Sequence, residues 1–188
     1  MITDLKYYLS HYKGFLSKDI CNKTILELES KEFAQHGFYN PVSDDVKNIS
    51  GNKELDVTYD KTSTKDFIMK ELWNGLKKYT GDLNFSWYGG WAGYSDIRFN
   101  RYNETRKMAE HCDHIHSLFE GKRKGIPILT ILGMLNDDYE GGELVFFEDT
   151  KIKTKQGDIL IFPSNFLYPH RVEPITKGVR WSYVSWVW

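Results

Sequence analysis

Two stretches of the chain carry apolar residues at helical spacing. In residues 17–30 apolar side chains recur three or four positions apart, and Ser17 precedes them as a candidate N-cap. In residues 63–80 a similar stripe follows Ser63 and Asp66, which have the form of a capping box. Both stretches predict amphipathic helices. The members of the stripes are Ile20, Cys21, Ile25 and Leu28 in the first helix and Ile68, Leu72, Leu76 and Tyr79 in the second.

The pattern changes after about residue 84. From there, β-branched and aromatic runs alternate with Gly, Asn, Asp and Pro, which predicts short strands separated by turns. The runs lie in residues 85–103, 126–136, 141–149, 157–164 and 178–188. Helices followed by strands indicate an α+β fold in which helices pack on a β-sandwich, and a double-stranded β-helix of the jelly-roll or cupin kind has this texture.

We expect one domain over residues 1–188. Residues 1–83 would supply helical support and a variable loop, and residues 84–188 the jelly-roll core. Residues 33–61, between the predicted helices, are polar and rich in Asn, Asp and Ser. This segment predicts a long loop or a short hairpin, and loops of this length often form lids or recognition surfaces.

Composition limits the classes of partner. The formal net charge is −1, which argues against binding to a long nucleic acid, and the basic cluster at residues 122–124 is expected on a solvated loop. Cys21 and Cys112 are far apart and make no disulfide framework. No apolar run approaches the roughly 18 residues that a membrane span needs. We therefore expect a reduced, cytoplasmic protein with no membrane partner.

Candidate chemistry concentrates in the stretch EHCDHIH, residues 110–116. The surrounding strand-like sequence favours a strand here, and on a strand alternate residues share a face. His111 and Asp113 would then point the same way. The opposite face would carry Cys112, His114 and His116. Structural zinc needs four tetrahedral ligands, so three alternate side chains do not predict a zinc site.

A further histidine can complete the first set. His170 follows the strand-like residues 159–163 and a turn-rich link, and would begin a strand next to the first one. Two histidines and one carboxylate on one side of a metal form the facial triad of non-haem Fe(II) oxygenases. Such a triad leaves three coordination positions for a bidentate cosubstrate and O₂. As a lone motif, His-x-Asp is common by chance, so the surrounding motifs decide its weight.

From about residue 98 to residue 188 the sequence resembles the catalytic domain of 2-oxoglutarate- and Fe(II)-dependent dioxygenases, in particular the prolyl 4-hydroxylase-like branch. The matching segments, in family order, are RYNETRKMAEHCD (101–113), TILGMLNDDYEGGELVFF (130–147), GDILIFPS (157–164) and HRVEPITKGVRWSYVSW (170–186).

The resemblance implies roles for particular positions. His111, Asp113 and His170 match the iron ligands, and Arg180 matches the basic residue that binds the distal carboxylate of 2-oxoglutarate. An arginine fork suits a carboxylate because it donates two parallel hydrogen bonds. Three further positions match residues that line the cosubstrate pocket: Tyr102, Thr130 and Trp186. The hydroxyl of Thr130 could donate to the same carboxylate as Arg180.

One position departs from the family pattern. Met134 stands where a tyrosine often donates to the cosubstrate carboxylate, so binding should depend more on Arg180 with help from Tyr102, Thr130 or Ser182. The N-terminal half carries no clear family motif. Because variable segments of this kind recognise the substrate in the family, the substrate is the part that the sequence defines least.

The resemblance implies an Fe(II)- and 2-oxoglutarate-dependent dioxygenase that uses O₂, with ascorbate as a candidate reductant. It would hydroxylate an amino-acid residue of a peptide, protein or small molecule, with peptidyl proline as the first choice, and release succinate and CO₂. Three alternatives remain open. The first is the same chemistry on a nucleobase or small metabolite. The second is a jelly-roll binding protein without activity. The third is a cupin-like site for another divalent metal, because affinity alone does not select Fe(II).

Overall fold

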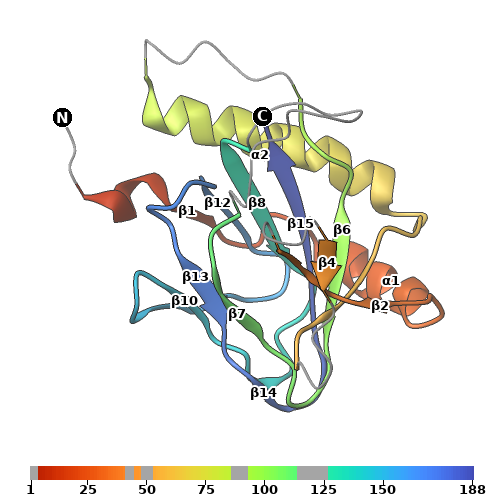
Figure 1. Cartoon of the computed structure of the whole chain (residues 1–188). Helices are drawn as coiled ribbons and strands as arrows, with labels where there is room; N and C mark the ends of the chain where they lie inside the picture. Colours follow the sequence, from red (N-terminus) through yellow and green to blue (C-terminus); the bar gives the residue numbers. More distant parts are fainter. Residues whose placement is uncertain (1–3, 41–44, 48–52, 86–92, 114–126) are drawn as a thin grey trace.

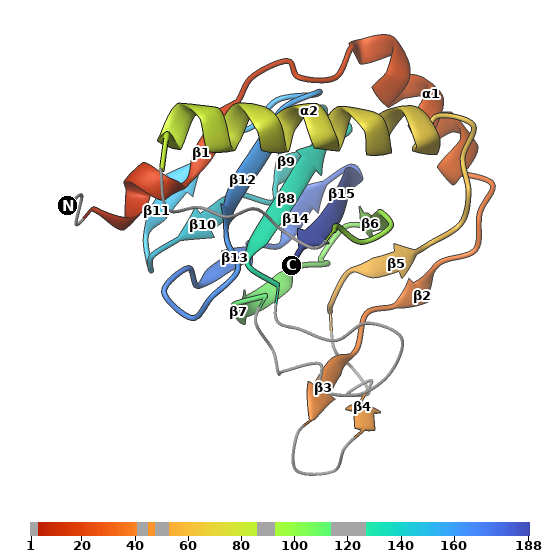
Figure 2. The ribbon, with the colours of Figure 1, turned by 90° about the horizontal axis from the view of Figure 1, so that it is seen from above.

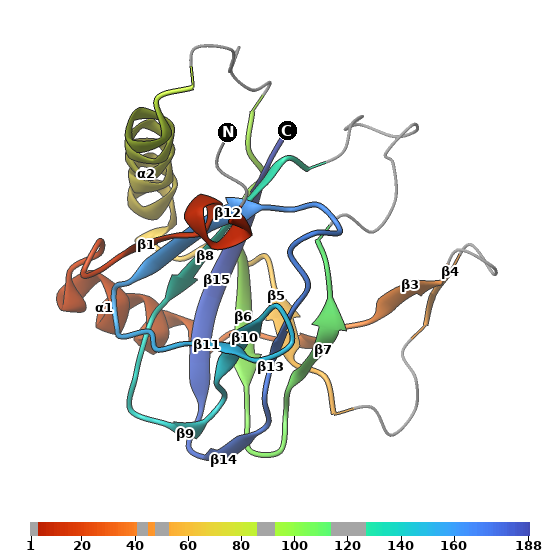
Figure 3. The same cartoon turned by 90° about the vertical axis from the view of Figure 1, so that its left-hand side faces the viewer.

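The computed structural model describes residues 4–40, 45–47, 53–85, 93–113 and 127–188. Two β-sheets face each other, and the two α-helices cover the outer side of the larger sheet (Figure 1, Figure 3). The helices are α1 (Lys18–Leu28) and α2 (Lys65–Leu83), and a short 3-10 helix, η1 (Leu5–Tyr8), precedes them. No helix of the described residues is long and apolar enough to cross a membrane.

The larger sheet has seven strands, and every pair of neighbours is antiparallel. Its order is β1-β12-β8-β15-β6-β5-β2, with the bounds Ser10–Tyr12, Ile159–Pro163, Leu129–Met134, Arg180–Val187, Arg98–Tyr102, Asp56–Thr58 and Ala34–Gln35. The chain thus places its first strand and its last two long strands in one sheet, which requires long-range pairing rather than local hairpins.

The smaller sheet has four strands in the order β11-β10-β13-β7, with the bounds Thr150–Ile152, Leu144–Phe146, His170–Val172 and Met108–His111. Two short pairs complete the strands: β14 (Ile175–Lys177) with β9 (Glu140–Gly141), and β3 (Phe38–Asn40) with β4 (Asp45–Lys47). The β3–β4 pair projects from the sandwich on the side away from α2 (Figure 2, Figure 3).

The alternation along β15 separates two cores. Trp181 and Tyr183 face the helices and belong to a core shared with α1 and α2. Val184 and Trp186 face the other way, into a core shared with residues of the smaller sheet. Because side chains alternate along a strand, each side chain of this sheet either packs under the helices or faces the space between the sheets. The sandwich with helices on one sheet is the architecture that the sequence predicts.

Both predicted helices are present. The first begins at the predicted N-cap, and the second does not. Ser17 caps α1, and its hydroxyl accepts a hydrogen bond of 3.4 Å from the amide of Ile20. The predicted capping box of α2 is wrong, because the N-cap is Thr64 and makes no side-chain cap. Ser63 instead donates its amide and its hydroxyl to the carboxylate of Glu27, which ties α2 to α1.

The apolar stripe of α2 is confirmed, since all four of its predicted members are buried. The helix approaches the sheet closely at Gly75, where a Cβ would lie 2.9 Å from Cδ1 of Ile159. A glycine here lets the helix axis lie close above β12.

The segment at residues 33–61 is partly a hairpin, as predicted, because β3 and β4 pair. It also contributes β2 and β5 to the larger sheet, where β5 pairs with β6. Short polar strands of this kind have no clear periodicity, and only pairing with a long strand stabilises them. Residues before position 84 therefore supply strands as well as helices to the sandwich.

Candidate metal centre

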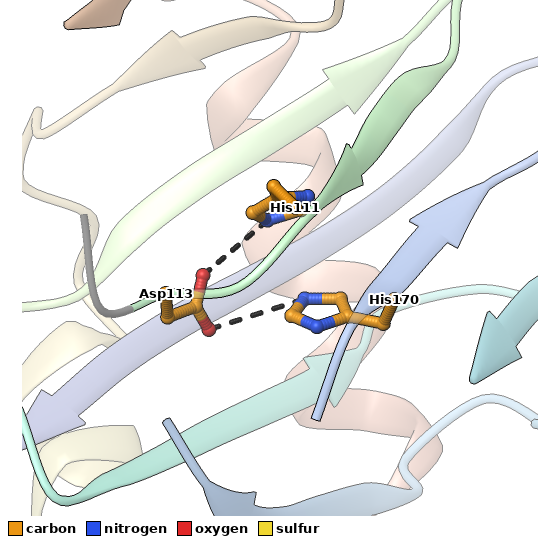
Figure 4. Close-up of side chains that lie close together, drawn as sticks. All are labelled: His111, Asp113 and His170. Atoms are coloured by element: carbon orange, nitrogen blue, oxygen red, sulfur yellow. Dashed lines mark ion pairs between the residues drawn. The ribbon is translucent and has the colours of Figure 1, made fainter. Parts of the chain in front are cut away.

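Three side chains converge between the sheets at the edge of the smaller one (Figure 4). The last residue of β7, His111, is paired in register with the first residue of β13, His170. Asp113 lies two residues beyond the end of β7. The ligand atoms of the three residues all lie within 4.8 Å of one another, as a common metal ligand set requires. The structure therefore brings His111, Asp113 and His170 together, as predicted. Of His111 and Asp113, only His111 lies on β7.

Backbone carbonyls fix the orientation of both imidazoles. Nδ1 of His111 donates to the carbonyl of Ala109 at 2.8 Å, and Nδ1 of His170 donates to the carbonyl of Tyr168 at 3.1 Å. A carbonyl only accepts, so the proton of each neutral ring lies on Nδ1 and the lone pair on Nε2. The Nε2 atoms face Asp113, at 3.3 Å for His111 and 3.9 Å for His170. This is the tautomer that a metal ligand needs.

The three groups also set one another's charge. Burial acts to raise the pKa of Asp113, but the hydrogen bond with His111 and the positive charges of the two histidines hold it well below its usual range. Burial acts to lower the pKa of His111, and the hydrogen bond and charge of Asp113 raise it instead. For His170 burial dominates and lowers the pKa to about 4. An ionised carboxylate and a neutral imidazole are the states that bind a metal.

The donor set fits a divalent transition metal. It holds two imidazole nitrogens and one carboxylate, which is the facial arrangement typical of non-haem Fe(II). His111 and His170 lie with ring centres 4.4 Å apart, so both approach one point from the same side. Phe146 and Phe162 pack against the ring of His170 at 5.1 Å each, which makes this side of the site apolar.

Thr130 lies beside the carboxylate of Asp113. Its hydroxyl donates to Oδ2 of Asp113 at 2.6 Å and lies 2.8 Å from the hydroxyl of Ser164. That Thr130 donates to the same cosubstrate carboxylate as Arg180 stays a prediction. In the register of the larger sheet Thr130 pairs with Trp186, about 20 Å along β15 from Arg180.

Arg180 is fully buried between the sheets, at 0% exposure. Its Nε donates to the hydroxyl of Tyr139 at 3.2 Å, and its Nη1 lies 3.3 Å from the hydroxyl of Ser182. The ring of Tyr102 lies 4.8 Å from the guanidinium carbon. Met134, which replaces the expected tyrosine, places its sulfur 3.3 Å from Nη2. A buried arginine without a carboxylate partner among the described residues is costly unless an anion pairs with it.

Trp186 lies on the interior face of β15 together with Arg180, but near its opposite end. The guanidinium carbon of Arg98 lies 5.0 Å from the centre of its ring. Among the described residues the indole nitrogen of Trp186 is buried with no hydrogen-bond partner. Trp186 and Thr130 are therefore near the metal ligands, whereas Tyr102 is near Arg180.

Sequence reasoning missed two residues of the site, Tyr139 and Arg98. Tyr139 precedes the glycine turn and reaches Arg180 only because β9 folds back against β14. Arg98 shares the interior face of β6 with Tyr102, since the two are an even number of positions apart. That alternation was available in the sequence, and it could have placed Arg98 in the cavity. His114, His116 and residues 122–124 lie outside the described residues.

A separate open cavity of about 720 Å³ lies beside α1. Of the described residues, those that line it include neither the three metal ligands nor Arg180. The lining residues are Asn22, Ile25, Leu26, Glu29, Arg101, Asn103, Asn136, Asp137, Asp138, Gln156, Gly178, Val179 and Trp181.

A β-sandwich with two histidines and a carboxylate converging between its sheets is the arrangement of a jelly-roll metalloprotein. Comparison with known sequences supports this class. Residues 97–188 match the family model of the 2OG-Fe(II) oxygenase superfamily. Over these residues the chain is similar to that superfamily, as the motifs around His111 and His170 predict.

Related sequences cover the same half. A PKHD-type hydroxylase of Idiomarina loihiensis is 39% identical over 94 residues, which are 48% of this chain and 41% of that protein. A PKHD-type hydroxylase of Methylobacterium nodulans is 40% identical over 95 residues, which are 47% of this chain and 40% of that protein. The chain thus spans about two fifths of the length of these curated relatives.

Solved structures share the fold over nearly the whole chain. The viral collagen prolyl hydroxylase of Paramecium Bursaria Chlorella virus-1 superposes with a TM-score of 0.67 at 17% identity, covering 96% of this chain and 94% of that one. A Pseudomonas putida prolyl-4-hydroxylase gives a TM-score of 0.65 at 16% identity, with coverage of 96% and 91%. The predicted double-stranded β-helix core with N-terminal helices is confirmed.

Proposed function

We propose that the chain is an Fe(II)- and 2-oxoglutarate-dependent dioxygenase that hydroxylates an amino-acid residue, with peptidyl proline as the first substrate to test. One observation carries the proposal. The three metal ligands and the fully buried Arg180 lie in the same space between the sheets, and both need partners that the described residues do not supply.

His111, Asp113 and His170 would hold the iron. His111 and His170 come from the paired strands β7 and β13, and Asp113 lies two residues beyond the end of β7. When bound, Fe(II) with 2-oxoglutarate and O₂ supplies the oxidation, in which 2-oxoglutarate becomes succinate and CO₂ and a substrate C–H bond becomes C–OH. The carbonyls of Ala109 and Tyr168 keep the imidazoles aimed at the metal throughout.

Arg180 would bind the distal carboxylate of 2-oxoglutarate. A guanidinium has five N–H bonds, and in the described structure Tyr139, Ser182 and Met134 each take one. Two N–H bonds then remain for a carboxylate. The buried position strengthens that pairing, because the charges interact in a low dielectric.

The choice of proline is supported by the relatives. The structures with the same fold include a prolyl hydroxylase of Trichoplax adhaerens in complex with a hypoxia inducible factor peptide, with a TM-score of 0.67.

The proposal is tested by loading the purified chain with Fe(II) without oxygen and then admitting air with 2-oxoglutarate and ascorbate. Succinate should form, and a panel of proline peptides should include one that gains the mass of one oxygen atom. His111→Ala should abolish succinate formation. Arg180→Gln should raise the 2-oxoglutarate concentration needed by about 10- to 100-fold, as expected for hydrogen bonds to a charged group.

Two results would count against the proposal. An unchanged requirement for 2-oxoglutarate in Arg180→Gln would refute the role of Arg180. Binding of metal and 2-oxoglutarate without succinate under any condition would instead support a jelly-roll binding protein that has the site and lacks the activity.

A further inference from the structure

A second arginine, Arg98, faces the space between the sheets close to the metal ligands. It is the first residue of β6, where it shares the interior face with Asn100 and Tyr102. Its Nε donates to the side-chain oxygen of Asn100 at 3.0 Å, which holds the guanidinium on this face. The side chain is half-buried.

Arg98 is connected to the metal ligands through one pair of strand neighbours. Its guanidinium lies over the ring of Trp186, and Trp186 pairs in register with Thr130. The hydroxyl of Thr130 is bonded to Asp113. Directly opposite residues in adjacent strands have Cβ atoms about 5 Å apart, so Arg98 lies within the reach of a small molecule that also contacts the metal.

Two groups of donors here lack acceptors. An arginine carries four N–H bonds on its two Nη atoms, and none of those of Arg98 has an acceptor among the described residues. The indole nitrogen of Trp186 is buried and likewise has no partner there. Half-buried cations and buried polar atoms are costly unless they are paired, so both donors favour a ligand with acceptor oxygens.

The acidic side chains described around this end of the sheet are engaged elsewhere. Asp113 accepts from Thr130 and faces the two histidines. Asp96 pairs with Lys65 at 2.9 Å. Glu54 accepts from the amide of Ala109. None of these forms an ion pair with Arg98 in the described structure.

We propose that Arg98, with the indole N–H of Trp186 beside it, binds a carboxylate of the substrate, so that preferred substrates carry a carboxylate near the carbon that is hydroxylated. This inference rests on the proposed function and narrows its substrate class. A carboxylate can accept from both donors at once, because it offers about four lone-pair positions. It could be the α-carboxylate of a free amino acid or of a chain terminus, or an acidic side chain next to the target residue.

The cosubstrate is not needed to explain Arg98. In the proposed function one carboxylate of 2-oxoglutarate lies at the metal and the other at Arg180. Arg180 packs on Tyr102, and Arg98 and Tyr102 are about 13 Å apart along β6. The two arginines therefore lie at opposite ends of β6, because Arg180 pairs in register with Tyr102.

The test uses matched carboxylates and amides as probes. The chain is loaded with Mn(II), saturated with 2-oxoglutarate without oxygen, and titrated in a calorimeter. One pair is L-proline and L-prolinamide. The other is an amidated peptide with proline followed by aspartate, and the same peptide with asparagine in that place. The first pair reports an α-carboxylate and the second an acidic side chain.

At least one carboxylate should bind about 10- to 100-fold more tightly than its amide, as expected for hydrogen bonds to a charged group. Arg98→Gln should remove this preference while the affinity for 2-oxoglutarate stays the same, and Arg98→Lys should keep part of it. Arg101→Gln is the matched control, because Arg101 is the other arginine of β6 and pairs with Asp56 at 3.3 Å. It should leave the preference unchanged.

Two outcomes overturn the inference while the proposed function stands. The first is that no pair shows a preference for the carboxylate in the unaltered protein that binds Mn(II) and 2-oxoglutarate. The second is that Arg98→Gln weakens 2-oxoglutarate binding and leaves the preference intact, which would assign Arg98 to the cosubstrate. Failure of the unaltered protein to bind metal or 2-oxoglutarate would overturn the proposed function itself, and the inference with it.

Discussion

Thr130 donates a hydrogen bond of 2.6 Å to Oδ2 of Asp113. Thr130 lies on β8 and Asp113 lies two residues beyond the end of β7, and residues 114–126 separate them in the sequence. A threonine in the middle of an apolar strand would otherwise bury an unpaired polar group. The bond leaves Oδ1 for the metal and restricts the rotation of the carboxylate.

Replacing Thr130 with valine should therefore weaken metal binding. Valine has the shape of threonine but cannot donate the hydrogen bond to Asp113. The metal affinity should therefore fall by about 10- to 100-fold, the usual effect of losing a hydrogen-bond partner of a metal ligand. Thr130→Ser keeps the hydroxyl and should retain most of the affinity. A titration with Mn(II) measures both. If metal affinity is unchanged and 2-oxoglutarate affinity falls, Thr130 serves the cosubstrate after all.

Removing the hydroxyl of Tyr139 should weaken the binding of 2-oxoglutarate by Arg180. Tyr139→Phe loses the 3.2 Å bond to Nε and leaves the two Nη contacts. A neutral-to-charged hydrogen bond of this kind contributes about 1.5–3 kcal/mol, so 2-oxoglutarate should bind about 10-fold more weakly or worse. Calorimetry on the Mn(II)-loaded protein measures this. Metal affinity should not change, and a parallel loss of metal would mean that the variant disturbs the fold.

Acid should destabilise the chain through Asp158. This buried carboxylate accepts hydrogen bonds from the amides of Gly14 and Lys155 and from the ring of His11. Burial acts to raise its pKa, but these hydrogen bonds and the charge of His11 hold the pKa below its ordinary value of 3.8. The unfolded state therefore binds the proton more readily. The contribution of Asp158 is present in full above about pH 3.8 and is lost as the pH falls through the folded value.

Asp158→Asn should cost about 2–3 kcal/mol of unfolding free energy at neutral pH, because hydrogen bonds to a charged group are lost. Below about pH 3.8, the unfolding free energy of this variant should also fall less steeply with decreasing pH than that of the unaltered chain. Urea unfolding over a series of pH values measures both effects. His11→Gln is the matched control and should cost less, since the two amide bonds remain. Equal acid sensitivity in Asp158→Asn and the unaltered chain would contradict this assignment.

Two glycines should respond to alanine with opposite signs. At Gly133 a Cβ would lie 2.0 Å from Cζ of Tyr183, so the ring must move and the core is overpacked. Gly133→Ala should cost at least about 1–3 kcal/mol. At Gly81, inside α2, nothing lies within 4 Å of the added Cβ, and Gly81→Ala should stabilise by about 0.5–1 kcal/mol. Urea unfolding compares the two. A neutral Gly133→Ala would mean that Tyr183 is free to move.

Local sequence patterns predicted much of the fold and the metal ligands. The apolar stripes of α1 and α2 follow helical spacing, which depends on the helix itself and needs no partner to be recognised. Strand alternation predicted that His111 and Asp113 point the same way, and the two do lie together, although β7 ends at His111. The position of His170 after a strand and a turn-rich link indicated the third member, and the family resemblance then added Arg180. The role of Ser63 was predicted wrongly. Its hydroxyl could cap α2 or bond to α1, and the sequence does not distinguish the two.

Tertiary structure decided the relationships between distant segments. Sheet register places His170 opposite His111, and the packing of the two sheets brings Thr130 to Asp113. A chain cannot show such pairings locally, because a shift of one residue in register would turn every side chain of a strand to its other face. The sequence by itself therefore determined which residues can bind iron and a carboxylate. The pairing of strands far apart in the chain, and the packing of the two sheets, decided which of these side chains lie close together.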